Sequence, residues 1–239
     1  MKKLVSIIAL CAIATPAFSA TKAARPSYLT RNTNGGYDVT YSYMDKQKSG
    51  WYASLRAELA FLNFKNKYST EVPLSAADDH DDYSFEPVFA IDGAFGKRFD
   101  YFWRAEVELG YITRFTDEDE GYKFTLDVPY AMVNGYYDFT NGLYLGAGLG
   151  VALPTTTWDS VAFTDAGNRS KTHVSPIAGL MAGFAHKLDD NIVLDLRYRI
   201  AGMMGGKHKR LMAPPQNYFE SKTGFILDNS ISIGLRYEF

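Results

Sequence analysis

From residue 50 to its end, the chain alternates apolar and polar side chains in short segments separated by turn-like sequences. Between Trp51 and Phe61 the odd positions are apolar, while the even positions from 52 to 58 are polar or charged. A period of two residues is typical of a β-strand with one apolar face. The pattern predicts seven further strands near residues 85–95, 103–111, 122–139, 143–153, 173–188, 192–200 and 225–239.

The connections between these segments alternate in length. Three are short, at residues 97–101, 140–142 and 189–191, and four are long, at residues 65–83, 113–121, 154–171 and 201–222. Outer-membrane barrels have short turns on the periplasmic side and long loops outside. In hydrocarbon every backbone group must be paired, so spanning strands have to close on themselves. The sequence therefore predicts an all-β fold, an eight-stranded antiparallel up-and-down transmembrane β-barrel over residues 50–239.

The fourth segment is harder to orient than the others. Its apolar face is formed by Phe124, Leu126, Val128 and Tyr130. If that face meets lipid, Asp127 on the opposite face points into the lumen. The alternation becomes ambiguous from Met132 to Asn134, which suggests a β-bulge there.

The first residues indicate export. Lys2 and Lys3 precede an apolar run from Leu4 to Ala14, which is shorter than the roughly 20 residues of a membrane-spanning helix. Ala17-Phe18-Ser19 then places small residues at −3 and −1 of a cleavage site. We expect residues 1–19 to be a signal peptide and the mature protein to lie in the bacterial outer membrane.

Composition narrows the possible chemistry. The sole cysteine, Cys11, lies in the signal peptide and follows Leu10 rather than a small residue, which argues against a lipoprotein. The mature chain then has neither a disulfide framework nor a thiolate metal site. Without the two lysines of the signal peptide, the mature chain has 23 basic and 27 acidic residues. This balance gives no basic stripe for a nucleic-acid partner.

Residues 20–49 precede the barrel pattern. Tyr37, Val39, Tyr41 and Tyr43 alternate with polar residues, and turn-like residues stand on both sides. Three arrangements fit: an extra partial strand, a strand in the lumen, or a periplasmic arm. We favour the arm.

Six short motifs resemble the opacity-protein and OmpA/OmpX-like family of small outer-membrane barrels, the porin-like surface antigens. They lie at residues 50–52, 103–108, 134–139, 144–150, 194–199 and 234–239. Together they run in order through residues 50–239. The resemblance implies the fold and the location but little about activity, because the functions of members diverge. It also implies that the terminal aromatic, Phe239, is the signal read by the outer-membrane insertion machinery.

Charged residues recur on the faces expected to point inward. The predicted lumen network consists of Arg56, Glu58, Glu86, Asp92, Arg104, Glu106, Glu108, Asp127, Asp195, Arg197, Arg199 and Arg236. Side chains just fill the interior of an eight-stranded barrel. We therefore expect ion pairs that plug the lumen; the alternative is a narrow polar channel lined by the same residues.

Other polar motifs support several interpretations. His173-Val174-Ser175 resembles the His-x-Ser of outer-membrane lipid A deacylases, although the Asn and Glu expected with it are missing. The acidic runs at 78–82 and 117–120 suit solvated loops, or divalent cations that bridge to lipopolysaccharide. The basic run at 207–210 suits an exposed loop or a contact with lipid phosphates.

The expected function is that of a non-enzymatic surface protein with structural, adhesive or ligand-binding display loops. The alternative is a small porin-like channel for ions or solutes, and a remote one is a lipid-modifying enzyme. We expect neither a cofactor nor a metal ion. The expected partners are outer-membrane lipid and lipopolysaccharide, the insertion machinery, and a host or environmental surface ligand.

Overall fold

The computed structural model describes residues 28–31, 37–40, 50–70, 77–100, 102–119, 122–160, 163, 169–212 and 218–239. The chain divides into two compact units, Met1–Lys48 and Ser49–Phe239. The predicted signal peptide, residues 1–19, lies outside the described residues.

The first unit contains a small antiparallel pair of strands, β1 (Tyr28–Arg31) and β2 (Tyr37–Thr40). Tyr28 lies opposite Thr40, and the two strands form a sheet of their own. The assignment of residues 20–49 to a periplasmic arm or an extra partial strand stays a prediction.

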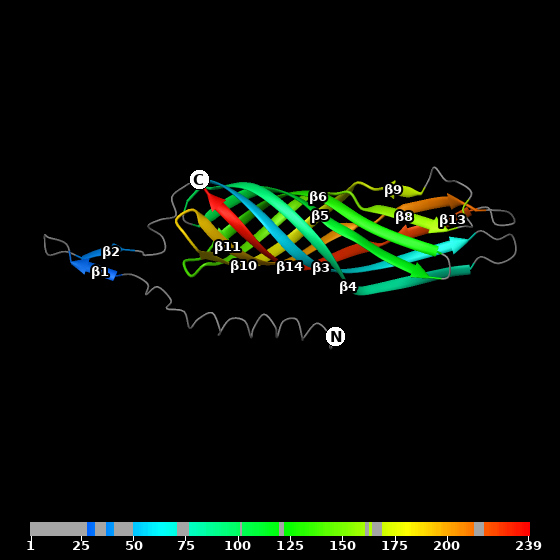
Figure 1. Cartoon of the computed structure of the whole chain (residues 1–239), viewed down its shortest axis with the longest axis horizontal. Helices are drawn as coiled ribbons and strands as arrows, with labels where there is room; N and C mark the ends of the chain where they lie inside the picture. Colours follow the sequence, from blue (N-terminus) through cyan, green and yellow to red (C-terminus); the bar gives the residue numbers. More distant parts are fainter. Residues whose placement is uncertain are drawn as a thin grey trace. The chain divides into compact units, whose positions relative to one another are not determined.

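Eight strands of the second unit form a closed antiparallel ring (Figure 1). In ring order they are β3 (Gly50–Thr70), β4 (Ala77–Arg98), β5 (Trp103–Asp119), β6 (Tyr122–Asp138), β7 (Leu143–Ala152), β10 (Ser175–Lys187), β11 (Ile192–Met204) and β14 (Phe225–Glu238). β3 pairs with both β4 and β14, which closes the ring. The predicted eight-stranded barrel is confirmed. The described chain holds no helix with the length and apolar character needed to cross a membrane.

The outer face of the ring carries an apolar belt. On β3, Trp51, Leu55 and Leu59 are exposed, whereas the alternate residues Tyr52 and Arg56 are buried. Aromatic residues gather at the short-turn end of the belt, where the Trp51 and Phe95 rings stack at 5.2 Å. An apolar band about 25 Å tall with aromatic girdles is what a transmembrane barrel presents to lipid.

The four long connections were predicted to be loops, and the structure corrects this. β3 continues to Thr70 and β4 starts at Ala77, while β5 reaches Asp119 and β6 starts at Tyr122. The other two connections contain β8 (Thr155–Ser160), β9 (Ser170–Thr172), β12 (Lys207–Leu211) and β13 (Tyr218–Thr223). The sheet thus extends beyond the apolar belt at the end opposite the short turns, because aromatic residues in these segments pack inside it.

Two β-bulges mark where the extensions begin. Between β3 and β4 the register shifts around Asn63, whose side-chain oxygen accepts the Phe85 N–H at 3.1 Å. Phe85 has a positive φ of 59°, a conformation that a bulge accommodates. The second shift lies in β5 between Ile112 and Phe115. On the side of each bulge away from the short turns, the inward positions of β4 and β5 change from even to odd, so Tyr83 and Phe115 point into the interior.

The orientation predicted for the fourth strand is wrong. In β6 the even positions from Phe124 to Tyr136 point inward without interruption. The predicted bulge at Met132 to Asn134 is absent from β6, whose register is shifted only by the bulge in β5. Asp127 is therefore on the outer face. The apolar residues of β6 that were assigned to lipid fill the interior instead.

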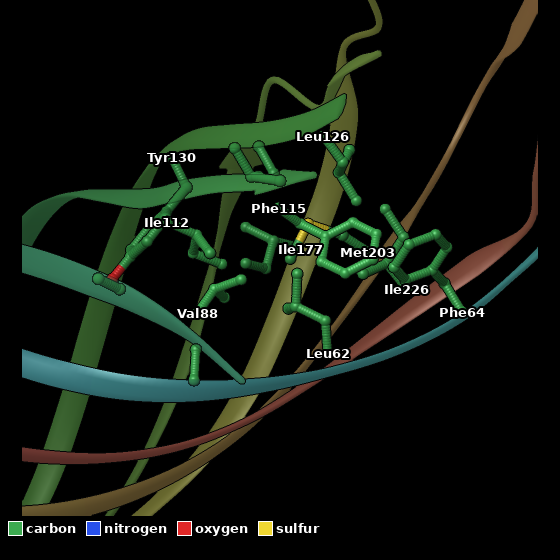
Figure 2. Close-up of a cluster of buried hydrophobic side chains, with 14 of the residues drawn as sticks. Leu62, Phe64, Val88, Ile112, Phe115, Leu126, Tyr130, Ile177, Met203 and Ile226 are labelled. Atoms are coloured by element: carbon green, nitrogen blue, oxygen red, sulfur yellow. The ribbon is translucent and has the colours of Figure 1, made fainter. Parts of the chain in front are cut away.

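These residues belong to a large apolar cluster inside the extended half of the barrel, here called the apolar plug (Figure 2). It includes Leu62, Phe64, Val88, Ile112, Phe115, Phe124, Leu126, Trp158, Ile177, Met203, Phe219 and Ile226. Its rings are in direct contact: Trp158 lies 4.9 Å from both Phe124 and Phe219, centroid to centroid. The plug fills this half of the lumen by ordinary hydrophobic packing.

Candidate functional site

Ten of the twelve predicted lumen residues are buried together in the half of the barrel nearer the short turns. They are Arg56, Glu58, Asp92, Arg104, Glu106, Glu108, Asp195, Arg197, Arg199 and Arg236. The strand period of two places them on the inward faces of β3, β4, β5, β11 and β14. Their ion pairs form what we call the lumen network.

Arg197 stands at the centre of the lumen network. Its Nη1 lies 2.6 Å from Glu108 and its Nη2 lies 2.9 Å from Asp92. Nη2 also donates to Glu58. One guanidinium on β11 therefore reaches carboxylates on β5, β4 and β3, across the full width of the lumen.

Two further arginines complete the centre. Arg199 contacts Glu58 and Glu108 at 2.8 Å each and Asp228 at 3.1 Å. Arg56 contacts Asp92 at 2.6 Å, Glu106 at 2.9 Å and Glu108 at 3.0 Å. Asp92 and Glu108 thus receive arginine donors from both β3 and β11, and Glu58 receives two donors from β11. Such multiple pairing is what a buried charge needs to offset its desolvation.

Tyrosines occupy the lumen beside the charges, although the predicted lumen network included none of them. The hydroxyls of Tyr52 and Tyr136 donate to Glu106 at 2.9 and 2.8 Å, and Tyr144 donates to Asp195 at 2.5 Å. Arg104 lies over the rings of Tyr136 and Tyr144, 3.9 and 4.6 Å from their centroids. The strand alternation already placed Tyr52 and Tyr144 on inward faces, whereas the parity near Tyr136 was ambiguous.

Glycines on neighbouring strands make room for the tyrosine rings. Four tyrosines stand directly opposite glycines: Tyr52–Gly96, Tyr130–Gly110, Tyr136–Gly146 and Tyr144–Gly183. A Cβ at Gly183 would stand 2.3 Å from the Tyr144 ring. Only glycine allows so close an approach, and an aromatic ring over a glycine supports a sheet where the glycine supplies no side chain.

The short-turn mouth of the lumen has its own ion pairs. Arg98 lies 2.6 Å from Asp138, which also accepts from Arg104 at 3.0 Å. Arg236 lies 3.2 Å from Glu238 and 3.6 Å from Asp195. Arg98 and Asp138 were missed because the sequence placed one in a turn and the other at an uncertain strand end. Strict continuation of the strand parity would have found both.

Two predicted lumen residues lie elsewhere. Asp127 is half-buried on the outer face of β6, because the inward face of that strand is apolar at this level. Glu86 is also half-buried, and its register partner on β3 is Leu62 of the apolar plug. The predicted assignment of Asp127 to the lumen is therefore wrong, and Glu86 lies beyond the ion-paired layer.

The His173-Ser175 motif is not arranged as an exposed nucleophile and base. Ser175 is buried, its Oγ accepts the Met204 N–H at 2.7 Å, and it donates to the Pro176 carbonyl at 3.1 Å. Partial burial and the nearby Lys171 lower the pKa of His173. The Ser175 hydroxyl is thus hydrogen-bonded to backbone groups of β10 and β11.

The acidic and basic runs belong largely to the strand extensions. In β4 and β5, the Tyr83 hydroxyl donates to Asp117 at 2.7 Å, and burial followed by this bond raises the pKa of Tyr83. Among the described residues, no group of three or more His, Cys, Asp or Glu is placed to hold a metal ion. Within the basic run in β12, Lys207 and Lys209 point outward.

The other two residues of the basic run point inward. His208 and Arg210 are buried, and Arg210 donates to the Trp158 carbonyl and lies 4.3 Å from the centroid of Phe163. The prediction of a basic loop at 207–210 is therefore corrected to a strand with two faces. Arg210 therefore lies against the aromatic residues at the end of the apolar plug that is farther from the short turns.

Solved structures share the fold at low sequence identity. OprG from Pseudomonas aeruginosa has a TM-score of 0.51 and 15% identity, over 81% of this chain and 98% of that chain. Neisserial surface protein A has a TM-score of 0.44 and 18% identity, over 81% and 100%. The outer membrane protease OmpT from Escherichia coli has a TM-score of 0.42 and 13% identity, over 81% and 100%. At these identities the likeness concerns the fold alone.

The sequence comparisons agree with the ring and its apolar belt. No protein of curated function matches the chain by sequence. The family model of the outer membrane protein beta-barrel domain matches residues 6–239, nearly the whole chain. The location predicted from the strand pattern, the bacterial outer membrane, follows from this match. The chain belongs to the outer-membrane β-barrel domain family.

Proposed function

We propose that the protein is a non-conducting surface protein of the outer membrane that presents a folded β-extension to the exterior. The observation that carries the proposal is the filling of the lumen at two successive levels. The lumen network crosses the barrel from β11 to β3, β4 and β5 through Arg197. Beyond it the apolar plug occupies the interior.

The strand extensions support a display role. Their outer faces are polar, with exposed residues such as Lys123 and Lys171. Their inner faces are packed against the apolar plug, which makes the extensions a rigid support. Binding residues on loops benefit from such a rigid support. The ligand class proposed is a host or environmental surface molecule.

Planar-bilayer recording tests the closed lumen. Purified full-length protein should add no steady current at moderate voltage, because ion pairs and packed rings leave no continuous water path. The Arg197→Ala variant serves as the comparison, since it removes a side chain that crosses the lumen. Stable, reproducible wild-type channels would overturn the proposal in favour of a small pore.

Surface labelling tests the display role. The mature chain is expected to contain no cysteine, so single cysteines report their own exposure. Lys171→Cys in β9 should react with a membrane-impermeant maleimide on intact cells. Lys187→Cys, at the short-turn end of β10, should react only after the outer membrane is permeabilised. The reverse pattern would show that the extension faces the periplasm.

A second proposal concerns Phe239, which we propose to be the signal for insertion into the membrane. It is exposed on the apolar belt, where its ring packs 5.3 Å from that of Tyr237, and its N–H bonds to the Trp51 carbonyl at 2.9 Å. A terminal aromatic on the lipid-facing side is accessible to the insertion machinery before the last strand is closed against β3.

A further inference from the structure

Five exposed lysines lie on the outer face of the strand extensions of β3, β12 and β13. They are Lys65, Lys67, Lys207, Lys209 and Lys222. Among the side chains that the structure describes, the acidic residues in contact with this group are Asp82 and Glu220. The patch therefore carries a surplus of positive charge.

The lysines begin where the apolar belt ends. On β3, Lys65 follows the outward-facing Phe61 by four residues, and along the chain Lys207 follows the exposed Met204 by three. Lys222 precedes the exposed Phe225 by three residues. A strand rises about 3.3 Å per residue, so Lys65, Lys207 and Lys222 lie about 10 to 13 Å along their tilted strands from the last lipid-facing side chains. That is the level of the lipid head groups at the outer surface.

The strand register places three of the lysines in one row. Lys207 stands opposite Lys222, which stands opposite Lys67. Like charges directly opposite each other destabilise a sheet. Such a row of lysines therefore destabilises the sheet unless a bound anion neutralises part of its charge.

Acidic neighbours compensate only part of the patch. Glu220 lies 2.7 Å from Lys209 and 3.7 Å from Lys207, and the bond from Lys209 lowers the pKa of the Glu220 carboxyl. Lys65 lies 2.8 Å from Asp82. Within the described part of the chain, neither Lys67 nor Lys222 is ion-paired.

A groove of about 460 Å³ connects the unpaired lysines to the apolar belt. Its lining includes Lys65, Lys67, Lys222, Gly224, Phe225 and one carboxylate, Asp82, which is paired with Lys65. It opens where β3 changes its partner from β14 to β13, and the Gly224 N–H bonds to the Lys65 carbonyl at 2.8 Å. One end of this lysine groove is therefore cationic and the other is aromatic.

We infer that the lysine groove binds a phosphate of lipid A, the lipopolysaccharide anchor of the outer leaflet. Lys67 and Lys222 receive the phosphate, and Phe225 contacts the first part of an acyl chain. The charge of the phosphate removes the repulsion along the lysine row. The inference rests on the outer-membrane location and on the proposed exposure of the extension to the exterior, which the cysteine labelling tests separately; it does not rest on the closed lumen.

Binding of purified lipid A to the full-length protein in zwitterionic nanodiscs tests the site. The bisphosphorylated form should bind more tightly than the dephosphorylated form. A lysine near an anionic lipid surface contributes about fivefold in affinity, so Lys67→Gln with Lys222→Gln should weaken binding of the bisphosphorylated form by about 25-fold. The matched control is Lys123→Gln with Lys171→Gln, which removes two exposed lysines from another part of the extension and should bind as wild type.

Heat-dependent migration on a denaturing gel shows that each variant has folded, and Lys222→Gln alone replaces the double variant if that one fails. Equal binding of phosphorylated and dephosphorylated lipid A would overturn the inference. So would wild-type affinity in the folded Lys222→Gln and double variants. Phosphatidylglycerol that competes as well as lipid A would show a site for any anionic lipid, which also contradicts the assignment to lipid A.

Discussion

Replacement of Arg197 by alanine should be among the most destabilising single changes in the barrel. The guanidinium contacts Glu108 at 2.6 Å, Asp92 at 2.9 Å and Glu58, and all four side chains are fully buried. Alanine leaves Arg56 and Arg199 as the close partners of the four central carboxylates Glu58, Asp92, Glu106 and Glu108, with Arg104 at 3.8 Å from Glu106. Breaking a buried pair by removing one partner costs about 3–5 kcal/mol. That corresponds to roughly two to three and a half orders of magnitude in the unfolding equilibrium constant.

Urea unfolding from lipid vesicles, followed by tryptophan fluorescence, measures this loss. Lys207→Ala is the control, because Lys207 is exposed and lies 3.7 Å from Glu220; an exposed pair contributes about 0–1 kcal/mol. Arg197→Lys adds a second comparison. It keeps the charge but loses the fork that donates to two carboxylates at once, so its stability should fall between wild type and Arg197→Ala.

The result that refutes this reasoning is a free energy of unfolding for Arg197→Ala within about 1 kcal/mol of the Lys207→Ala control. Water would then reach the network freely, and the lumen would be a hydrated channel. Equal stability of Arg197→Lys and wild type would have a narrower meaning. It would show that net charge, and not the bridging geometry, stabilises the centre.

Three further predictions concern assembly, the apolar plug and the tyrosine–glycine contacts. Deletion of Phe239 should lower the amount of protein in isolated outer membranes, and Glu238→Gln should do so less; normal assembly of the deletion removes the proposed signal. Trp158→Ala should lower the free energy of unfolding by about 3–5 kcal/mol, because the ring is buried between aromatic neighbours. On intact cells, this variant should be cleaved faster by added protease within the strand extension. Unchanged cleavage would mean that the plug does not hold the extension together. Gly183→Val should displace the Tyr144 ring and lower the urea midpoint; an unchanged midpoint would show that this contact is dispensable.

The strand faces within the membrane were predictable because lipid and lumen select opposite residues there. In β11, Leu194 and Leu196 alternate with Asp195 and Arg197, and the structure gives this strand the predicted faces. β14 behaves in the same way down to its last residues. Where a strand had charges on one side within the apolar belt, the assignment was correct.

The assignment failed in β6 because its charges lie on the outer side. Lys123 is exposed and lies 3.4 Å from Glu118, and Asp127 is also on the outer face. Phe124 and Leu126 are buried inside. The rule that apolar residues face lipid holds only where lipid surrounds the barrel, and this part of β6 lies beyond the belt.

The partners within the lumen could not be read from one sequence. The spacing of Arg197, Glu108 and Asp92 along the chain does not show that the three side chains meet, because their contact depends on which strands face each other across the closed ring. The contacts of the lumen tyrosines depend on the same closure. Tyr136 follows the stretch where the alternation was ambiguous, and its burial is explained by its bond to Glu106 and by the Arg104 guanidinium over its ring.

Charged side chains fill the lumen at one level and apolar side chains fill it at the next. This follows because lipid surrounds the strands at the first level and water surrounds them at the second. Inside the membrane, an apolar side chain gains little by turning from lipid to the interior, since lipid tails are as apolar as leucine. The interior there is held by charges such as Arg56 and Glu58. Beyond the belt the outside is water, so burial of Phe64 and Leu62 is favourable in the ordinary way. On β3 the inward residues change from charged to apolar after Glu58, and the outward residues become polar at Asn63. The exchange of the two patterns therefore locates the outer edge of the membrane within a few residues.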